Sequence, residues 1–232
     1  MRLAGFQPLT LLDYPGKVAA TVFTQGCPFR CVYCHNPELL PMRAALGTTL
    51  ETEDVLAKIA AHRSFLDGVC VTGGEPTVHP DLPDFLARIK DLGVLVKLDT
   101  NGLHPRMIAT IIERGLADFF AMDLKHVWER YGDVIGPAGR AAVANCQETM
   151  AIIRASGVPS EFRTTVYPAL HSEAYLLTIA GYLGPGDRYA LQEIRYDKTL
   201  QADLPRSERV DLEVVARRIR AAQPDLQVEV RR

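Results

Sequence analysis

No stretch of this 232-residue sequence approaches the roughly 20 consecutive apolar residues that a membrane-spanning helix requires. The opening residues, MRLAGFQPLTLLDYPGK, lack an apolar core behind a positively charged region, so they do not resemble a secretory leader. Basic residues are not in excess, because 26 Lys and Arg face 28 Asp and Glu and leave a formal net charge of −2. That balance gives no charge pattern suited to nucleic-acid phosphates or an anionic membrane. We therefore expect a cytoplasmic protein with no membrane partner, for which nucleic acid is not an expected ligand.

A secreted disulfide framework is also missing. The chain has five cysteines, an odd number, and three of them fall within residues 27–34, whereas secreted frameworks spread an even number along a short chain. Reduced thiols are the expected state. Because 47% of the residues are hydrophobic and no linker, repeat or low-complexity tract interrupts them, we expect a single domain over residues 1–232.

Apolar strands and amphipathic helices alternate along the chain. The strands are predicted at residues 18–23, 69–72, 94–98, 119–124, 162–166 and 189–191. Six β-then-α units in series predict a parallel α/β sheet with right-handed crossovers, either a barrel or an open doubly wound sheet. We divide the domain into an N-terminal β-hairpin (1–25), a core (about 17–192) and a C-terminal helix and strand (about 207–231).

Polar and glycine residues follow several of these strands. In parallel α/β folds catalytic groups lie at the carboxyl ends of the strands. That rule alone selects a set of candidate positions before any family is considered: Cys27, Gly73, Asp99, Asp123 and Gln192.

Cys27, Cys31 and Cys34 have the spacing Cys-x3-Cys-x2-Cys on one short loop. Three thiolates select zinc or an iron–sulfur cluster. A structural zinc ion normally needs a fourth ligand, which only His35 could supply locally, whereas a [4Fe–4S] cluster held by three cysteines keeps one iron open. Two further cysteines, Cys70 in a strand and Cys146 on a helix face, are interpreted as small buried hydrophobes. The histidines show no metal spacing, and five are interpreted as surface or loop residues: His62, His79, His104, His126 and His171.

The cysteine spacing, Tyr33 before the last cysteine and the sequence Gly73-Gly74-Glu75-Pro76 after the next strand together resemble the radical S-adenosylmethionine (SAM) superfamily. The segments DYPGK (13–17) and CHNP (34–37) narrow the resemblance to activating enzymes of glycyl-radical proteins, and among these to the anaerobic ribonucleoside-triphosphate reductase activating proteins. The resemblance spans essentially the whole chain. It implies a partial (β/α)6 barrel of the TIM type, one [4Fe–4S] cluster on the three cysteines, and SAM chelated to the open iron.

The resemblance also implies which residues contact SAM. Gly73 and Gly74 would let the backbone approach the methionyl amine, and Glu75 is either a further contact or a hydrogen-bonded turn residue. Asp123 and Lys125 lie two apart and so share one face of a strand. The carboxylates of Asp99 and Asp123 would accept hydrogen bonds from the amine or the ribose of SAM. Lys125 would offset the charge of the SAM carboxylate. The full set of implied cofactor-binding residues is Tyr33, Gly73, Gly74, Glu75, Asp99, Asp123, Lys125, Arg163 and Gln192.

Two of these positions, and Asn101 beside them, need a further comment. Arg163 is either a cofactor contact or an arginine paired at the barrel rim. Gln192 stands where some relatives place a ribose-contacting histidine. Asn101, followed by Gly102, is interpreted as a turn behind the site.

The resemblance implies reductive cleavage of SAM, with electrons from a donor such as flavodoxin or ferredoxin, and a glycyl radical formed on anaerobic ribonucleotide reductase. Other enzymatic interpretations are an activase of another glycyl-radical enzyme of the pyruvate formate-lyase type, or a radical SAM enzyme acting on a small molecule or RNA. In a different class, the cysteine trio could mark an iron–sulfur electron carrier or a structural zinc protein. The Gly-Gly-Glu-Pro sequence argues against that class, since neither role needs a sulfonium-ligand pocket.

Overall fold

The computed structural model describes residues 1–43, 49–137 and 139–232. Its strands are β1 (Leu3–Thr10), β2 (Ala19–Thr24), β3 (Gly68–Gly73), β4 (Leu95–Thr100), β5 (Phe119–Asp123), β6 (Ser160–Val166), β7 (Arg188–Glu193) and β8 (Gln227–Arg231). Its α-helices are α1 (Thr52–His62), α2 (Leu82–Asp91), α3 (Pro105–Glu113), α4 (Tyr131–Ile135), α5 (Gly139–Ala155), α6 (Glu173–Ala180) and α7 (Leu212–Ala222). Short 3-10 helices are η1 (Pro37–Leu39), η2 (Pro76–Val78) and η3 (Trp128–Arg130).

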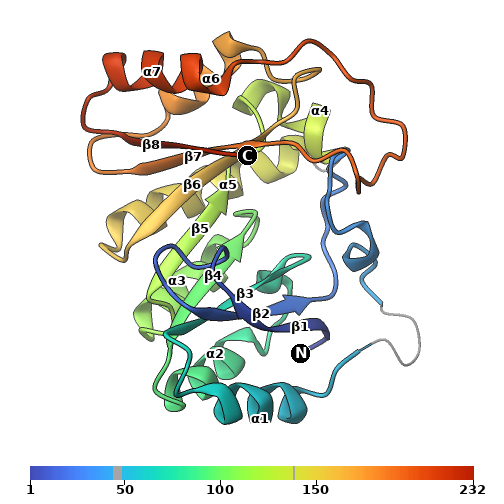
Figure 1. Cartoon of the computed structure of the whole chain (residues 1–232), viewed down its shortest axis with the longest axis vertical. Coiled ribbons are helices and arrows are strands. Elements are labelled where there is room, and N and C mark those ends of the chain that lie inside the picture. The colour runs from blue at the N-terminus through green and yellow to red at the C-terminus, as the bar shows by residue number, and fades with distance from the viewer. Residues whose placement is uncertain (44–48, 138) are drawn as a thin grey trace.

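The strands form one sheet in the order β1 to β8 (Figure 1). β1 is antiparallel to β2, as the predicted hairpin requires, and each later neighbouring pair is parallel. The sheet runs from β1 at one edge to β8 at the other, so it is an open, partial barrel. The predicted strands correspond to β2–β7, and the predicted fold class is confirmed.

The C-terminal part differs from the prediction in two details. β8 pairs in parallel with β7, so α7 and β8 form a further β/α crossover and the parallel part contains seven strands instead of six. The final helix begins at Leu212, not near residue 207, because the Asp211 carboxylate caps its first turn. That carboxylate accepts hydrogen bonds from the backbone N–H groups of Glu213 (3.0 Å) and Val214 (3.1 Å).

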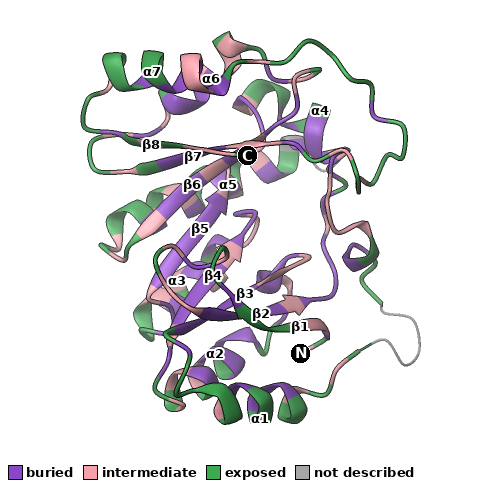
Figure 2. Ribbon diagram, viewed as in Figure 1, coloured by how far each residue is buried: buried purple, intermediate pink, exposed green. Residues whose placement is uncertain are grey.

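The central parallel strands β3–β6 are mostly buried, as Figure 2 shows. β3 illustrates the alternation. Val69 and Val71 are fully buried in the apolar core, whereas Cys70 points the other way, toward Asp99 inside the barrel. The outer face of the sheet is therefore apolar, and its inner face carries polar and charged groups.

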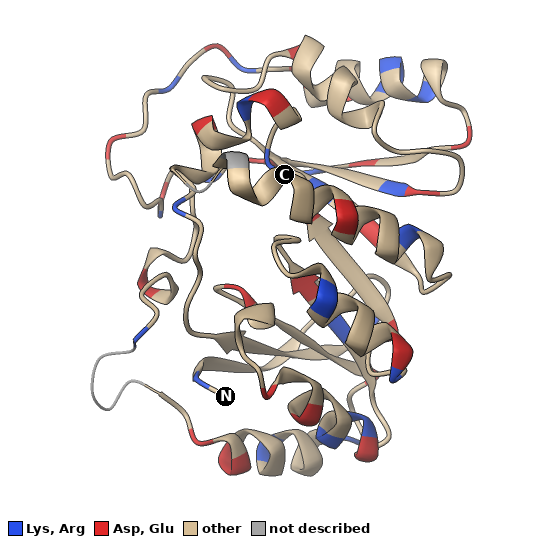
Figure 3. Cartoon of the chain, turned by 180° about the vertical axis from the view of Figure 1, so that it is seen from behind, with Lys and Arg blue, Asp and Glu red and all other residues tan. Residues whose placement is uncertain are grey.

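The helices bury one apolar stripe each. In α2, Phe85, Leu86 and Ile89 are buried, and the helix is followed by Gly93 with φ +79°, as the predicted C-terminal cap requires. Acidic and basic residues are interspersed along the helices (Figure 3). Among the described residues, no helix is both long enough and apolar enough to cross a bilayer.

Candidate active site

A cavity of about 350 Å³ opens at the carboxyl ends of the parallel strands. Every site residue selected from the sequence lines it: Cys27, Cys31, Tyr33, Cys34, Gly73, Gly74, Glu75, Asp99, Asp123, Lys125, Arg163 and Gln192. These residues come from six consecutive strands or the loops that follow them. The sheet therefore brings together groups that lie up to 165 positions apart, from Cys27 to Gln192 (192 − 27).

The cysteine loop leaves β2 and is held at both ends by backbone hydrogen bonds. The N–H of Cys27 donates to the carbonyl of Leu40 (3.1 Å), and the N–H of Cys34 donates to that of Cys31 (2.9 Å). The loop is also tied to α4, because Val32 N–H donates to the carbonyl of Val134 (3.2 Å). These contacts fix the loop without using a side chain from the trio, so the thiols remain available for ligation.

Burial suppresses thiolate formation in the metal-free site. Cys27 and Cys31 are 6% and 8% exposed. Desolvation raises the pKa of Cys27 to about 12 and that of Cys31 to about 11, and the pKa of Cys34 is raised as well. The positive charge of Lys125 opposes this rise in pKa at all three thiols. Thiolate ligation here therefore needs the positive charge of a metal centre and releases protons when the centre forms.

The donor set fits an iron–sulfur cluster better than a single ion. In the described part of the chain, no three His, Cys, Asp or Glu side chains converge as they would around one metal ion. Thiolates of a [4Fe–4S] cluster bind separate irons and need not converge in that way. His35, the local candidate for a fourth zinc ligand, instead accepts a hydrogen bond at Nε2 from the N–H of Arg195 (3.3 Å).

The Gly73–Gly74 turn packs directly on the chain that leads into the cysteine loop. A Cβ on Gly73, which has φ +116°, would lie 2.3 Å from the nitrogen of Thr24. A Cβ on Gly74 would lie 2.3 Å from the carbonyl oxygen of Gly26. The glycines are therefore required by strand packing, and the predicted approach to the methionyl amine stays a prediction.

Glu75 is a hydrogen-bonded turn residue, which was one of its two predicted roles. Its side chain is buried and accepts from Thr77 N–H (3.1 Å) and Oγ1 (2.5 Å), Thr100 Oγ1 (2.8 Å) and Asn101 N–H (2.6 Å). Burial raises its pKa, and these donors oppose that effect. Glu75 thus ties the turn after β3 to the turn after β4 at the cavity wall, and its contact with a ligand stays a prediction.

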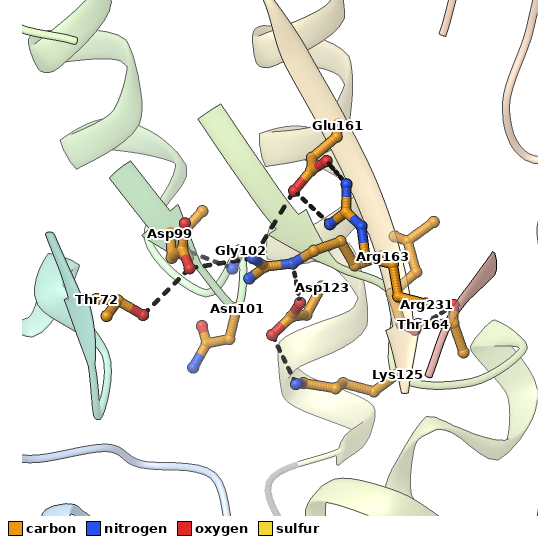
Figure 4. Close-up of polar contacts among 12 residues, drawn as sticks. Thr72, Asp99, Asn101, Gly102, Asp123, Lys125, Glu161, Arg163, Thr164 and Arg231 are labelled. Carbon is orange, nitrogen blue, oxygen red and sulfur yellow. Dashed lines mark hydrogen bonds and ion pairs between the residues drawn. The ribbon is translucent and has the colours of Figure 1, made fainter. Parts of the chain in front are cut away.

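A chain of ion pairs crosses the inner face of the sheet (Figure 4). Arg163 bridges two carboxylates, donating to Asp123 Oδ1 (2.9 Å) and to Asp99 Oδ2 (3.1 Å). Lys125 Nζ donates to Asp123 Oδ2 (2.8 Å), so the predicted shared face of Asp123 and Lys125 is confirmed. Arg163 is therefore a paired arginine, which was one of its two predicted roles, and it also lines the cavity.

These pairs keep both aspartates ionised. Burial alone would raise the pKa of each carboxyl group, but Arg163 with Lys125 holds that of Asp123 well below its usual range, and Arg163 with Lys97 lowers that of Asp99. Lys97 is buried beneath the cavity, and its ammonium contacts Asp99 Oδ1. The cavity therefore offers anionic and cationic groups side by side, which suits a zwitterionic ligand.

Two further residues line the cavity, although neither was selected as a cofactor contact. Asn101 was interpreted as a turn residue, but its buried Nδ2 donates to Cys27 Sγ (3.7 Å). Asp13, present in the sequence only as part of the DYPGK segment, lines the cavity and accepts a hydrogen bond from Thr21 Oγ1 (2.5 Å). The contact of Asn101 with Cys27 had no sequence signal, because it joins chain segments 74 positions apart that meet only in the folded sheet.

Cys70 and Cys146 are both fully buried, as predicted. Cys146 belongs to the apolar core, and its Sγ donates to the carbonyl of Asn101 (3.4 Å). Cys70 is not an ordinary hydrophobic residue, because its Sγ donates to Asp99 Oδ1 (3.7 Å) and lies 3.8 Å from Lys97 Nζ. Neither thiol lines the cavity that contains the trio.

The five histidines lie in loops or at helix ends, in agreement with the prediction of surface or loop residues, but three of the loop histidines are buried. His79, His126 and His171 are at most 2% exposed. Their ring nitrogens are satisfied by backbone groups: His171 Nε2 is 2.8 Å from the carbonyl oxygen of Lys125, and its Nδ1 accepts from the N–H of Tyr167 (3.0 Å). Such pairing lets a neutral imidazole be buried without a metal.

We expect the stability of the metal-free protein to fall between pH 6.5 and pH 4 because of these histidines. Burial lowers the pKa of His171 to about 4. Since the unfolded chain binds the proton near pH 6.5, the contribution is complete above that value and is lost as the pH falls through the window. The slope for one such histidine is about 1.4 kcal/mol per pH unit.

Urea unfolding at pH 7, 6 and 5 measures this effect. His171→Gln should be less stable than the natural protein at pH 7 but should lose less stability on acidification. His62→Gln is the control, because His62 is exposed. Equal slopes for the natural protein and the His171 variant would contradict the prediction.

Comparisons with known proteins agree with this geometry. The sequence profile of the "Radical SAM superfamily" matches residues 21–175. A Methanocaldococcus jannaschii protein, provisionally named as a glycyl-radical enzyme activating enzyme, is 31% identical over 82% of this chain and 79% of its own length. The pyruvate formate-lyase-activating enzyme of Clostridium pasteurianum is 34% identical over 54% of this chain, and the match covers 53%, about half, of that enzyme's length.

Solved structures share the fold at low sequence identity. Streptococcus suis SuiB bound to SAM has a TM-score of 0.70 at 11% identity, covering 90% of this chain and 48% of SuiB. Escherichia coli QueE has a TM-score of 0.59 at 17% identity, covering 99% of this chain and 93% of QueE. The profile match, the homologues and the cavity lead to one conclusion: the chain belongs to the radical SAM superfamily of enzymes, whose cofactors are a [4Fe–4S] cluster and SAM.

Proposed function

We propose that this protein is a glycyl-radical enzyme activating enzyme, which cleaves SAM reductively and generates a glycyl radical on a partner protein. The observation that carries the proposal is the cavity at the carboxyl ends of the parallel strands, which is lined by three cysteine thiols, two of them buried and the third half-buried. The homology to activating enzymes supports the reaction class. When bound, the cluster and SAM supply one-electron cleavage of the sulfonium to methionine and a 5′-deoxyadenosyl radical that abstracts hydrogen from a glycine.

Cys27, Cys31 and Cys34 would hold the cluster. The carboxylate groups of Asp99 and Asp123 are ionised at neutral pH and suit the ammonium or ribose hydroxyls of SAM. Lys125 opposes the rise that burial causes in the pKa of the three thiols, and it stands beside Asp123, so the same ammonium can offset the SAM carboxylate. The protein's own contribution is thus orientation of a zwitterion next to the thiols.

Several other residues would shape the site from its walls. Gln192 lines the cavity from β7, where it can meet the ribose in place of a histidine. Tyr33 is 3% exposed, and its hydroxyl donates to the carbonyl of Lys125 (3.5 Å). This contact links the cysteine loop to the residue proposed to bind the ligand carboxylate, and burial of the ring helps to exclude water.

For the partner, we propose anaerobic ribonucleoside-triphosphate reductase, on the strength of the DYPGK and CHNP segments. A pyruvate formate-lyase is the second candidate, because enzymes that activate it are 30–34% identical to this chain over about half of their length. The electron donor is proposed to be a flavodoxin or a ferredoxin.

Anaerobic reconstitution with iron and sulfide tests the chemistry. We expect a brown protein with about four irons per chain, whose dithionite-reduced form converts SAM to methionine and 5′-deoxyadenosine. A colourless protein that binds one zinc ion would contradict the proposal.

Electron paramagnetic resonance tests the partner. Mixing the reduced holoenzyme and SAM with each of the two candidate glycyl-radical enzymes should give a glycyl radical on the reductase and not on the lyase. A radical on the lyase alone would reassign the partner, whereas SAM cleavage without a radical on either would overturn the activase assignment.

A further inference from the structure

The C-terminal strand contributes a charged side chain to the interior of the barrel. β8 lies outside the segment that matches the superfamily profile, and Arg231 on it is level with Gln192 of β7. The Arg231 guanidinium reaches across β7 and donates two hydrogen bonds to Glu161 of β6 (3.1 and 2.7 Å). Ala190 is the inward-facing residue of β7 between them, and its small side chain leaves room for the arginine to cross.

Glu161 is the immediate neighbour of Arg163 on the inner face of β6. The Glu161 side chain is only 4% exposed, and its Oε1 lies 3.9 Å from Arg163 Nη1 (Figure 4). Arg163 itself makes shorter contacts with Asp123 and Asp99, at 2.9 and 3.1 Å. Three carboxylates therefore surround one guanidinium, and Arg163 lies nearer to the two that line the cavity.

Glu161 and Arg231 do not line that cavity. They line a separate cavity of about 270 Å³ together with Pro15 and Gln227. Any effect of this pair on SAM must therefore pass through Arg163. A buried carboxylate that loses its partner is strongly destabilised and takes the nearest cation, which here is Arg163.

We propose that Arg231 is a positioning residue: by pairing with Glu161, Arg231 keeps that carboxylate from capturing Arg163, so that Arg163 stays between Asp99 and Asp123. The inference rests on the proposed role of these three residues in SAM binding. The α7–β8 crossover lies outside the segment that matches the superfamily profile, and the inference gives this crossover a part in forming the cofactor site.

The proposal predicts an unusual pattern of variants in the reconstituted holoenzyme. Arg231→Met frees Glu161 to draw Arg163 out of the site, and should weaken SAM binding about tenfold. Glu161→Gln removes the competing charge and should bind SAM as the natural protein does. The double variant Arg231→Met/Glu161→Gln should regain most of the affinity lost in Arg231→Met.

The matched control is Glu229→Gln. Glu229 is the other partner of Arg231 (2.8 Å), and its side chain is 62% exposed. Its replacement should leave the SAM dissociation constant unchanged.

Anaerobic titration calorimetry with SAM gives the dissociation constants, and thermal unfolding of the same samples separates binding from folding. A purely structural pair would lower stability in Arg231→Met without recovery of SAM affinity in the double variant, and that result would overturn the inference. So would a Glu161→Gln variant that binds SAM as weakly as Arg231→Met. If the natural holoenzyme binds SAM and Arg231→Met binds it equally well, only this inference fails. If the natural holoenzyme neither binds nor cleaves SAM, the proposed function fails and this inference fails with it.

Discussion

Replacing Cys27, Cys31 or Cys34 by alanine is expected to abolish both the cluster and SAM cleavage. Each thiol lines the cavity, and no spare thiol lines it in the described part of the chain. Loss of one ligand leaves two thiols, which is too few to hold a [4Fe–4S] cluster with one open iron. After anaerobic reconstitution, iron and sulfide per chain and the yield of 5′-deoxyadenosine measure the two losses.

Cys70→Ala and Cys146→Ala are the matched controls. Both thiols are fully buried and outside the cavity, so removing the sulfur leaves a small void that costs about 1–2 kcal/mol of unfolding free energy. Both variants should assemble the cluster and cleave SAM. A Cys70 or Cys146 variant that folds but binds no iron would show that the ligands have been wrongly assigned.

The positions of the site residues could be predicted because the fold places strand ends together. Cys27, Gly73, Asp99 and Asp123 each follow or end an apolar strand, and the order of the sheet matches the order of the sequence. In such a sheet, strand ends that are separated in sequence become neighbours without any further information.

The contacts that could not be predicted are those made sideways across the barrel. Arg231 on β8 reaches across β7 to Glu161 on β6, and Asn101, which follows β4, reaches Cys27. Both depend on sheet curvature and on the size of intervening side chains, which a linear pattern does not encode. The burial of His171 was missed for a related reason, since its two partners are backbone groups, one in its own loop and one at Lys125 in a distant loop.

Alanine at Gly73 or Gly74 is expected to be among the most damaging single changes in the protein. Gly73→Ala combines a backbone conformation that L-residues rarely adopt, φ +116°, with a Cβ 2.3 Å from the nitrogen of Thr24. Gly74→Ala adds only the clash, 2.3 Å from the carbonyl oxygen of Gly26. Because backbone atoms cannot move aside as a side-chain tip can, each should cost more than about 4 kcal/mol of unfolding free energy.

Gly93→Ala separates strain from clash. Gly93 has φ +79° but no atom within 4 Å of the added Cβ, so this variant should lose only about 1–2 kcal/mol. Urea unfolding of the three metal-free variants gives the comparison, and iron content after reconstitution shows whether the shift reaches the cysteine loop. Gly26 directly precedes Cys27, so displacement of its carbonyl by Gly74→Ala should also reduce cluster assembly, whereas Gly93→Ala should assemble a full cluster. Equal losses of stability in Gly74→Ala and Gly93→Ala would mean that the turn can open without disturbing β2, and that the close packing of the two strand ends does not hold the cysteine loop in place.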